Sequence, residues 1–342
     1  MLRKKQLKNK PFIIAEVGQN HQGNVKIAAE YIKCFAQNGA DTIKFQTREN
    51  KTLFSEGAYN KVYNSENAFA NVYGKHREKL ELNKKDLIYL KAQCKKNKMK
   101  FMSTPFDKTS LKLLLSIGVD LIKIASFDLG NLSLIEKIAK SKIPTVLSTG
   151  GGNLDHIKES VKLLSKYNSN IAILHCVSEY PCEVENLGLE KIKTLTKLFP
   201  KFTIGLSDHF NGILSGPVAY TMGARVFEKH VTLNRAWKGS DHNFALEPNG
   251  FRLFARDINR VPRMMKEKKN NQLGKEPVFK KLGKSIIAVK DLQKGKKISI
   301  NDIDGMIFEK QFIPIRETYK ILKKKLKKNL LKGQPLSLSD LY

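Results

Sequence analysis

The chain has 342 residues, of which 41% are hydrophobic, so its length allows one domain of ~250 residues and a second, small one. No apolar run approaches the ~20 residues that a membrane span needs, and no signal-peptide pattern follows the basic N-terminus. The four cysteines lack a Cys-x-x-Cys spacing. Together these features lead us to expect a cytoplasmic protein. Lysine and arginine outnumber aspartate and glutamate by 62 to 32, a formal charge of +30 that would attract phosphorylated metabolites, nucleic acid or acidic lipid, although a solvated lysine-rich surface is the simpler interpretation.

Strand-like and helix-like segments alternate along most of the chain. The first ten residues are predicted as a disordered or edge-covering arm, and the apolar residues 12–18 as a buried strand. Apolar residues at helical spacing predict a helix over residues 24–39, and residues 42–47 alternate as a strand does. Further strands are predicted at residues 100–105, 121–126, 145–150, 171–177, 202–208 and 225–230. Eight such strands at this length indicate an α/β fold, a TIM (β/α)8 barrel rather than a doubly wound sheet.

Two stretches fall outside this alternation. Residues 48–82 are the longest irregular stretch, and their aromatic side chains favour an ordered lid. Residues 266–281 are predicted as a linker, and residues 282–342 as a separate unit with short strands at residues 285–289 and 305–308. At ~60 residues this unit is too small for a second enzyme and is predicted to dock or to cover substrate. The barrel domain is expected to occupy residues 1–265.

Two strand ends each combine a histidine with an acid. The strand at residues 202–208 leads into Asp208 and His209, and the strand at residues 225–230 ends on Glu228 and His230, with Asp241 in the following loop. The carboxyl ends of barrel strands face one pocket, so two imidazoles there suggest a metal site with room for substrate and water. A structural histidine is the simpler interpretation of either one alone, and their matching positions favour the metal site.

Lysines and hydroxyls occupy the ends of the other strands. Lys44 and Gln46 stand near one strand end, and Lys123 near another. Neighbouring strand ends carry Ser103, Thr104, Ser126, Ser148, Thr149, Ser178 and Ser207. Such groups in one pocket suit a phosphate or carboxylate, because hydroxyls donate hydrogen bonds and ammonium groups supply charge. The pattern predicts a small phosphorylated acid beside a metal-activated carbonyl or water.

Several motifs carry a resemblance to a known family. They are FIIAEVGQNHQG, IKFQT, FMSTPFD, IKIAS, LSTGG, LHCVSEYP, IGLSDH, FEKH and WKGSDHNFALEP. In order and spacing they resemble the sialic acid synthase family, which condenses phosphoenolpyruvate with an N-acetylated hexosamine, and they cover nearly the whole predicted barrel. The resemblance implies a TIM barrel followed by a β-rich antifreeze-like (SAF) domain, which GKSIIAVKDLQKGKKIS matches more loosely. It also implies a divalent metal, Mn²⁺ or Mg²⁺, and a domain-swapped homodimer.

The resemblance implies a reaction and its variants. The expected substrates are phosphoenolpyruvate and N-acetylmannosamine or its 6-phosphate, giving N-acetylneuraminate or its 9-phosphate plus phosphate. The alternative is a synthase for a related nonulosonic acid, legionaminic or pseudaminic acid, or another metal-dependent enzyme that condenses phosphoenolpyruvate with an aldose. Neither a membrane nor nucleic acid is an expected partner.

Residues of the predicted pocket take their expected roles from the same resemblance. The phosphoenolpyruvate-binding groups would be Lys44, Gln46, Thr104, Lys123, Ser126, Ser148, Ser178 and Ser207. Of these, Ser178 stands where many members have asparagine, and Lys44 and Lys123 would offset negative charge in the reaction. The metal ligands would be His209 and His230.

The amino-sugar contacts would be Glu16, Tyr180 and Asp241, and Glu16 is the candidate for proton handling. Many bacterial members carry a Lys-Arg-Pro-Gly run in the C-terminal domain, whose arginine reaches the sugar in the partner subunit. This chain lacks that run, and Arg316 or Lys310 would substitute for the arginine.

Two other functions compete with this one. A Schiff-base aldolase on the same barrel would use Lys123 or Lys44 as nucleophile, but the histidine pair argues against it. The basic C-terminal unit could instead bind nucleic acid or an acidic surface. It lacks the interleaved aromatic residues that stack on bases, which argues against nucleic acid.

Overall fold

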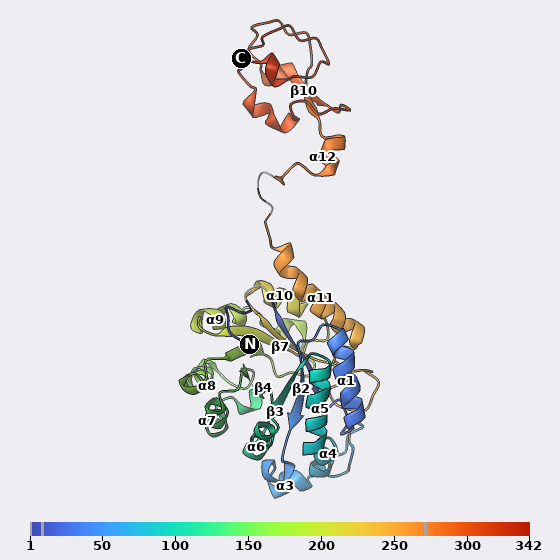
Figure 1. Cartoon of the computed structure of the whole chain (residues 1–342), viewed down its shortest axis with the longest axis vertical. Coiled ribbons are helices and arrows are strands. Elements are labelled where there is room, and N and C mark those ends of the chain that lie inside the picture. Colours follow the sequence, from blue (N-terminus) through green and yellow to red (C-terminus); the bar gives the residue numbers. More distant parts are fainter. Residues whose placement is uncertain (1, 8–9, 268, 270–271) are drawn as a thin grey trace. The chain divides into compact units, whose positions relative to one another are not determined.

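The computed structural model describes residues 2–7, 10–267, 269 and 272–342 (Figure 1). The chain divides into two compact units, Met1–Met265 and Lys266–Tyr342. Each unit has a buried hydrophobic core of its own, so the two are described in turn.

The described residues of the first unit contain eight parallel strands that close into a barrel in chain order. The strands are β1 (Phe12–Gly18), β2 (Thr42–Thr47), β3 (Lys100–Pro105), β4 (Leu121–Ile124), β5 (Thr145–Ser148), β6 (Ile171–Cys176), β7 (Thr203–Asp208) and β8 (Val226–His230). The last strand pairs with the first, with Glu16 opposite His230, which closes the ring. The predicted barrel is therefore confirmed.

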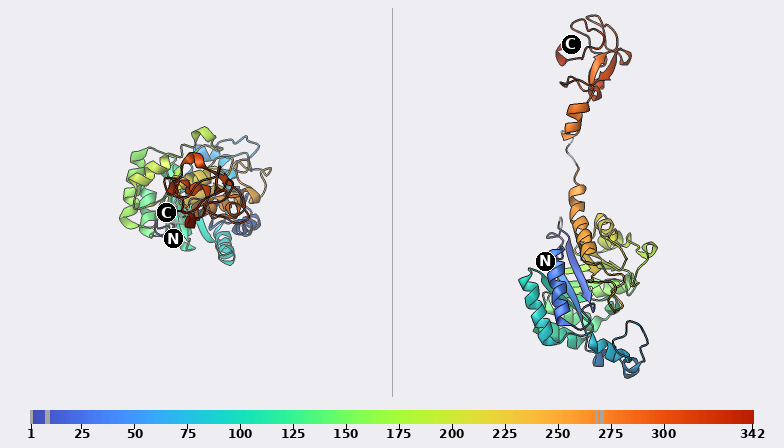
Figure 2. Two further views of the ribbon diagram at one scale, coloured as in Figure 1. Left: turned by 90° about the horizontal axis from the view of Figure 1, so that it is seen from above. Right: turned by 90° about the vertical axis from the view of Figure 1, so that its right-hand side faces the viewer.

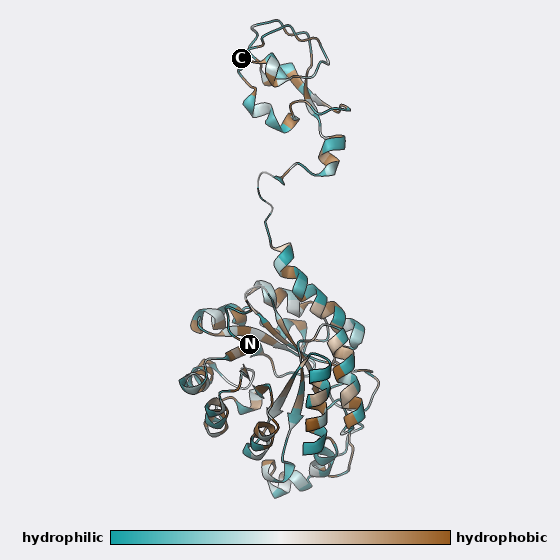
Figure 3. Ribbon diagram, viewed as in Figure 1, coloured by the Kyte–Doolittle hydropathy of each residue, from teal (hydrophilic) through white to brown (hydrophobic). Residues whose placement is uncertain are grey.

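Helices cover the outside of these strands (Figure 2). They are α1 (Val25–Gln37), α5 (Lys84–Lys96), α6 (Lys108–Ser116), α7 (Leu132–Ser141), α8 (Leu154–Tyr167), α9 (Lys191–Leu198), α10 (Ser215–Thr221) and α11 (Pro248–Met264). The side chain of Asn24 accepts hydrogen bonds from the backbone N–H groups of Lys26 and Ile27, and so begins α1. Tyr31 and Phe35, one turn apart, lie on its buried face. Figure 3 shows hydrophobic and hydrophilic residues alternating along such helices, as one buried and one exposed face require.

The segment between β2 and α5 contains three short helices. It contains α2 (Asn50–Leu53), α3 (Glu56–Asn60) and α4 (Tyr73–Lys79), so the stretch predicted as irregular over residues 48–82 is irregular only between these helices. Aromatic contacts hold the segment together: the ring centroid of Tyr63 lies 4.7 Å from that of His76 and 5.2 Å from that of Tyr73. The helices are too short for periodicity to reveal them, and side-chain packing supplies their stability.

Residues 2–7 cover the end of the barrel where the strands begin. The backbone N–H of Leu2 donates to Oδ1 of Asn170 at 2.8 Å, and Oγ1 of Thr203 donates to the carbonyl of Leu2 at 2.6 Å. Leu2 and Leu7 are buried together with Phe12 and other interior residues of the strands. In residues 2–7 the predicted arm therefore covers the barrel and is ordered, whereas residues 1, 8 and 9 lie outside the described residues.

The second unit contains a small antiparallel sheet, as the predicted β-rich domain requires. Strands β9 (Ser285–Ala288) and β10 (Ile303–Met306) pair with each other, and β10 begins two residues earlier than predicted. The core is formed by Ile286, Ala288, Leu292, Ile298, Ile313, Ile321, Leu326, Leu330, Leu336 and Leu341. Helix α12 (Pro277–Leu282) lies largely within the predicted linker, with a proline at its first position. Residues 268, 270 and 271 of that linker lie outside the described residues.

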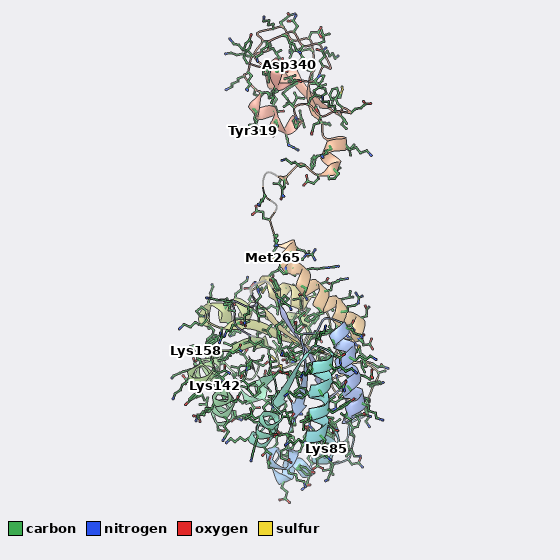
Figure 4. All side chains as sticks on the ribbon, in the orientation of Figure 1. Lys85, Lys142, Lys158, Met265, Tyr319 and Asp340 are labelled. Atoms are coloured by element: carbon green, nitrogen blue, oxygen red, sulfur yellow. The ribbon has the colours of Figure 1, made fainter. Side chains whose placement is uncertain are left out.

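Much of the positive charge is on the outer surface. Lys85, Lys142 and Lys158 are exposed on or beside the outer helices of the first unit (Figure 4). Lys158 pairs with Asp155 at 3.1 Å, the kind of solvated ion pair that contributes little to stability. Within the part of the chain that the structure describes, no helix is long and apolar enough to cross a membrane.

Candidate active site

The carboxyl ends of the barrel strands surround a cavity of about 230 Å³. The sequence-predicted residues that line it are Glu16, Lys44, Gln46, Thr104, Lys123, Ser126, Ser148, Tyr180, Ser207, His209, His230 and Asp241. These residues are far apart in the chain, and the closed ring of strands brings them to one place.

The predicted site residues that do not line this cavity are Ser103, Thr149, Ser178, Lys310 and Arg316. Oγ of Ser178 is buried without a hydrogen-bond partner close to Gly150, where an added Cβ would lie 2.6 Å from it. Ser178 follows the end of β6 by two residues. Arg316 belongs to the second unit, where its guanidinium donates to the carbonyl of Gly274 at 3.1 Å.

Two lysines and two glutamates form a buried network at the bottom of the cavity. Nζ of Lys44 lies 2.8 Å from Oε2 of Glu16 and 3.7 Å from Oε1 of Glu228. Nζ of Lys123 donates to both carboxylate oxygens of Glu228, at 2.6 and 2.8 Å. All four side chains are at most 5% exposed. The network therefore keeps two ammonium groups in place inside the barrel, where an incoming anion can interact with them.

The same surroundings shift the pKa values of the two carboxyl groups in opposite directions. Burial raises the pKa of Glu16, although Lys44 opposes the shift. Burial alone would also raise the pKa of Glu228, but Lys123 and Lys44 outweigh it and lower that pKa to about 2. Glu228 is therefore a fixed negative charge, whereas Glu16 is the carboxyl group better suited to accept and release a proton.

A glycine at the end of β1 lets three polar side chains meet. Gly18 has a φ of +56°, in the left-handed region that favours glycine. A Cβ at this position would lie 3.2 Å from Nε2 of Gln46, 3.4 Å from Oε1 of Glu16 and 3.5 Å from Oδ2 of Asp241. Nε2 of Gln46 in turn donates to Oε1 of Glu16 at 2.9 Å. The expected sugar contacts Glu16 and Asp241 are therefore close neighbours.

The two predicted metal ligands face each other across the ends of β7 and β8. The ring centroids of His209 and His230 are 5.4 Å apart, and the ring of Tyr180 lies 4.1 Å from that of His209. Burial lowers the pKa of both histidines to about 4, with the second histidine lowering that of His209 further. Both rings are therefore neutral at neutral pH, the form that binds a metal ion.

The hydrogen bonds of the two rings fit a metal ion. Nδ1 of His209 lies 2.6 Å from the carbonyl of Val177, which requires a proton on Nδ1 and leaves Nε2 with its lone pair. Nδ1 of His230 is buried without a hydrogen-bond partner and lies 3.8 Å from Oδ2 of Asp241. Among the described residues, no group of three or more His, Cys, Asp or Glu side chains is placed so that it could hold a metal ion by itself. An ion on this pair would thus take its other ligands from water or substrate.

A buried ion pair ties together the strands that carry the two histidines. Nζ of Lys229 lies 2.7 Å from Oδ2 of Asp208, and the two side chains are 1% and 0% exposed. Oδ2 of Asp208 also accepts a hydrogen bond from Oγ of Ser215 at 2.5 Å. Because Asp208 precedes His209 and Lys229 precedes His230, this pair fixes the spacing of the histidines.

Sequence reasoning missed other residues of the cavity wall. Arg48, Arg77, Gln19, Phe106 and Ser240 also line the cavity. Arg48 is the first residue after β2, and that position could have indicated it. Arg77 lies on α4, in the segment predicted as irregular, and no local sequence pattern marks it.

The loop after β1 contains a buried histidine that should make stability depend on pH. Burial lowers the pKa of His21 to about 3, and its Nδ1 accepts a hydrogen bond from the backbone N–H of Gly23 at 3.1 Å. Because the unfolded chain binds a proton near pH 6.5 and the folded chain does not, acidification favours unfolding. From pH 7 to pH 5 this histidine is expected to remove about 2 kcal/mol from the free energy of unfolding.

Urea unfolding of the wild type and of His21→Gln at both pH values checks this expectation. The difference between the two pH values should be smaller in the variant by that amount, because the other histidines contribute equally to both proteins. An unchanged difference would show that His21 is protonated in the folded protein.

Comparison with known proteins identifies the family. The chain matches the NeuB family over residues 31–270. The N-acetylneuraminate-9-phosphate synthase of Mus musculus is 32% identical over 316 residues, covering 92% of this chain and 88% of that protein. The N,N'-diacetyllegionaminic acid synthase of Campylobacter jejuni subsp. jejuni is 35% identical over 300 residues, covering 85% of this chain and 88% of that protein.

A solved structure agrees with these relatives. The crystal structure of N-acetylneuraminic acid (sialic acid) synthetase from Leptospira borgpetersenii serovar Hardjo-bovis in complex with citrate is 31% identical, with a TM-score of 0.70. The alignment covers 80% of this chain and 93% of that chain. The resemblance drawn from the strand-end motifs is thus confirmed, and the chain is an enzyme that belongs to the NeuB family, together with synthases of sialic acid and related nonulosonic acids.

Proposed function

We propose that this enzyme condenses phosphoenolpyruvate with N-acetylmannosamine or its 6-phosphate and water, giving N-acetylneuraminate or its 9-phosphate and phosphate. The observation that carries the proposal is the meeting of two buried lysines and two neutral histidines in one cavity. The lysines suit the anionic donor, and the histidines suit a metal beside the acceptor aldehyde. The named relatives include synthases of both N-acetylneuraminate 9-phosphate and N,N'-diacetyllegionaminic acid, so a related nonulosonic acid is the alternative product.

Phosphoenolpyruvate would occupy the deep part of the cavity. Its charges would interact with Lys44 and Lys123, and its oxygens would accept hydrogen bonds from hydroxyl groups on the surrounding strand ends. The proposed hydroxyl groups are those of Thr104, Ser126, Ser148 and Ser207. Oγ of Ser148 is buried without a hydrogen-bond partner, which is consistent with a donor that a ligand satisfies.

The acceptor sugar would lie above, with its aldehyde toward the histidines. Mn²⁺ or Mg²⁺ held by His209 and His230 would act as a Lewis acid on the aldehyde oxygen. Phosphoenolpyruvate C3 forms a bond to the aldehyde carbon, water adds at C2, and the resulting tetrahedral intermediate loses phosphate. Lys44 and Lys123 would offset the negative charge on the departing phosphate. Glu16, whose pKa burial raises, would take the proton that the attacking water loses.

The ion pairs around the two lysines disfavour a Schiff-base mechanism. Glu228 lies 2.6 Å from Lys123, and Glu16 lies 2.8 Å from Lys44, so each carboxylate favours the ammonium form. Burial opposes this for Lys123 and lowers its pKa. A nucleophilic lysine must be neutral, which would leave the paired carboxylate with an uncompensated charge in the barrel interior.

Phosphate release tests the proposed function. Purified protein with phosphoenolpyruvate and Mn²⁺ should release phosphate only when an amino sugar is added, with N-acetylmannosamine, its 6-phosphate and a di-N-acetylated relative as the panel. Mass spectrometry should then detect the condensed nine-carbon acid. Full activity in excess chelator would contradict the metal assignment, and trapping of a keto acid by borohydride would favour the aldolase instead. The homodimer implied by the resemblance stays a prediction, which analytical ultracentrifugation would check.

A further inference from the structure

Two arginines at the mouth of the cavity have no role in the chemistry described so far. Arg48 directly follows β2, and Arg77 lies on α4. Both line the cavity together with Gln19, Phe106 and Ser240, away from the lysines at its base. Positive charge on a cavity wall needs either an acidic partner or an anionic ligand.

The guanidinium of Arg48 is held in place by its contacts, but one of its nitrogens has no hydrogen-bond partner. Its side chain is 7% exposed, its guanidinium stacks 3.8 Å from the ring centroid of Phe106, and its Nη2 donates to Oε1 of Gln46 at 2.5 Å. Its Nη1 is buried without a hydrogen-bond partner and is 3.5 Å from Oε1 of Glu81. Burial and the charge of Arg77 lower the pKa of Arg48 to about 10, so the guanidinium remains charged at neutral pH. A fixed, charged guanidinium with an unused donor is suited to an incoming anion.

Arg77 has no ion-pair partner within 4.0 Å among the residues that the structure describes. Its Nε is buried without a hydrogen-bond partner, and its guanidinium lies 5.9 Å from the ring centroid of Tyr73. Near this wall, Glu81 is already used, since its carboxylate accepts hydrogen bonds from the backbone N–H of Arg48 and from Nε2 of Gln19. The wall therefore has two arginines near two acids, Glu81 and Asp241, and two unsatisfied donors.

The position of the arginines indicates which substrate supplies the anion. Arg48 donates to Gln46, an expected phosphoenolpyruvate contact, but Gln46 in turn donates to Glu16, an expected sugar contact. Arg48 also interacts electrostatically with Asp241, another expected sugar contact that lines the same cavity. Lys44 and Lys123, at the base, are the cations proposed for phosphoenolpyruvate. We propose that Arg48 and Arg77 form an anion subsite that binds a phosphate ester on the acceptor sugar, at the carbon farthest from its aldehyde. The inference rests on the proposed function and selects the 6-phosphorylated sugar as substrate.

The wild-type enzyme tests this without any substitution. Steady-state phosphate release is measured with N-acetylmannosamine 6-phosphate, N-acetylmannosamine and a neutral di-N-acetylated sugar. We expect kcat/KM for the phosphorylated sugar to exceed that for either neutral sugar by roughly 100-fold, as two charge-assisted contacts allow. Equal or better use of a neutral sugar would overturn the inference and leave the proposed function standing. Absence of phosphate release with every sugar would overturn both.

Arg77→Met tests the residue itself. The ratio of kcat/KM for the phosphorylated sugar to that for the neutral sugar should fall by roughly 10- to 100-fold, and Arg77→Lys should restore part of it. Lys79→Met, two residues further on α4 and exposed, removes the same charge outside the cavity and should leave the ratio unchanged. An equal loss with both sugars, or a rise in the KM for phosphoenolpyruvate in place of the sugar effect, would overturn the assignment.

Discussion

Replacement of His230 by glutamine, or of His209 by asparagine, is expected to lower kcat/KM by roughly 1000-fold or more, because losing the proposed Lewis acid at the aldehyde would cost several kcal/mol. The two ring centroids are 5.4 Å apart, and both rings are neutral at neutral pH because burial lowers each pKa to about 4. Either substitution leaves a single imidazole, which is a weak site for Mn²⁺ or Mg²⁺.

Calorimetric titration with Mn²⁺ separates loss of the metal from loss of the fold. Both variants should bind Mn²⁺ at least 10-fold more weakly than the wild type, while their circular dichroism spectra stay unchanged. His156→Gln is the control, since His156 is exposed on α8 and does not line the cavity. Wild-type affinity for Mn²⁺ in both histidine variants would mean that the ion binds elsewhere.

Lys229→Met is expected to destabilise the barrel by about 3–5 kcal/mol, the cost of leaving one charge of a buried ion pair without its partner. The carboxylate of Asp208 would keep its hydrogen bonds from Oγ of Ser215 and from the backbone N–H of Phe210, but would lose its only cation within 4.0 Å among the described residues. Urea unfolding followed by circular dichroism measures the change.

A double-mutant cycle distinguishes the unpaired charge from lost packing. In Lys229→Met with Asp208→Asn the buried charge is absent, so stability should recover by more than 1 kcal/mol relative to Lys229→Met alone. The surface pair of Lys140 with Glu136, 2.8 Å apart and half exposed, is the matched control: Lys140→Met should cost less than about 1 kcal/mol. Similar losses for Lys229→Met and Lys140→Met would contradict the role given to the buried pair.

The barrel was predictable because its signal is local and repeated. Each predicted strand is a short apolar run before a loop, and every one of these runs forms a strand within two residues of its predicted ends. The helices of residues 50–79 were not predictable in this way. Their stability depends on contacts such as that of Tyr63 with His76, which join residues that no helical period relates.

Most of the candidate site was also predictable, because the carboxyl ends of parallel strands in a barrel must share one face. That rule locates Lys44 and His230 once the strand boundaries are known. It does not extend to Ser178, which lies beyond the end of β6 and is not among the residues that line the cavity. It also misses Arg77, which a helix between strands carries to the cavity wall.

The order of polar and apolar residues by itself predicted the closed ring of strands, and the residue types at the strand ends predicted which side chains surround its mouth. The family came from the motifs that resemble it. Only the tertiary structure decided how charge is distributed among them. Two lysines lower the pKa of Glu228, whereas burial raises that of Glu16, and Asp208 and Lys229 form a buried pair. Arg77 has no ion-pair partner within 4.0 Å among the described residues. The physical reason is that burial and electrostatic interaction depend on distances between side chains on different strands. Those distances are set by packing, which no local stretch of sequence contains.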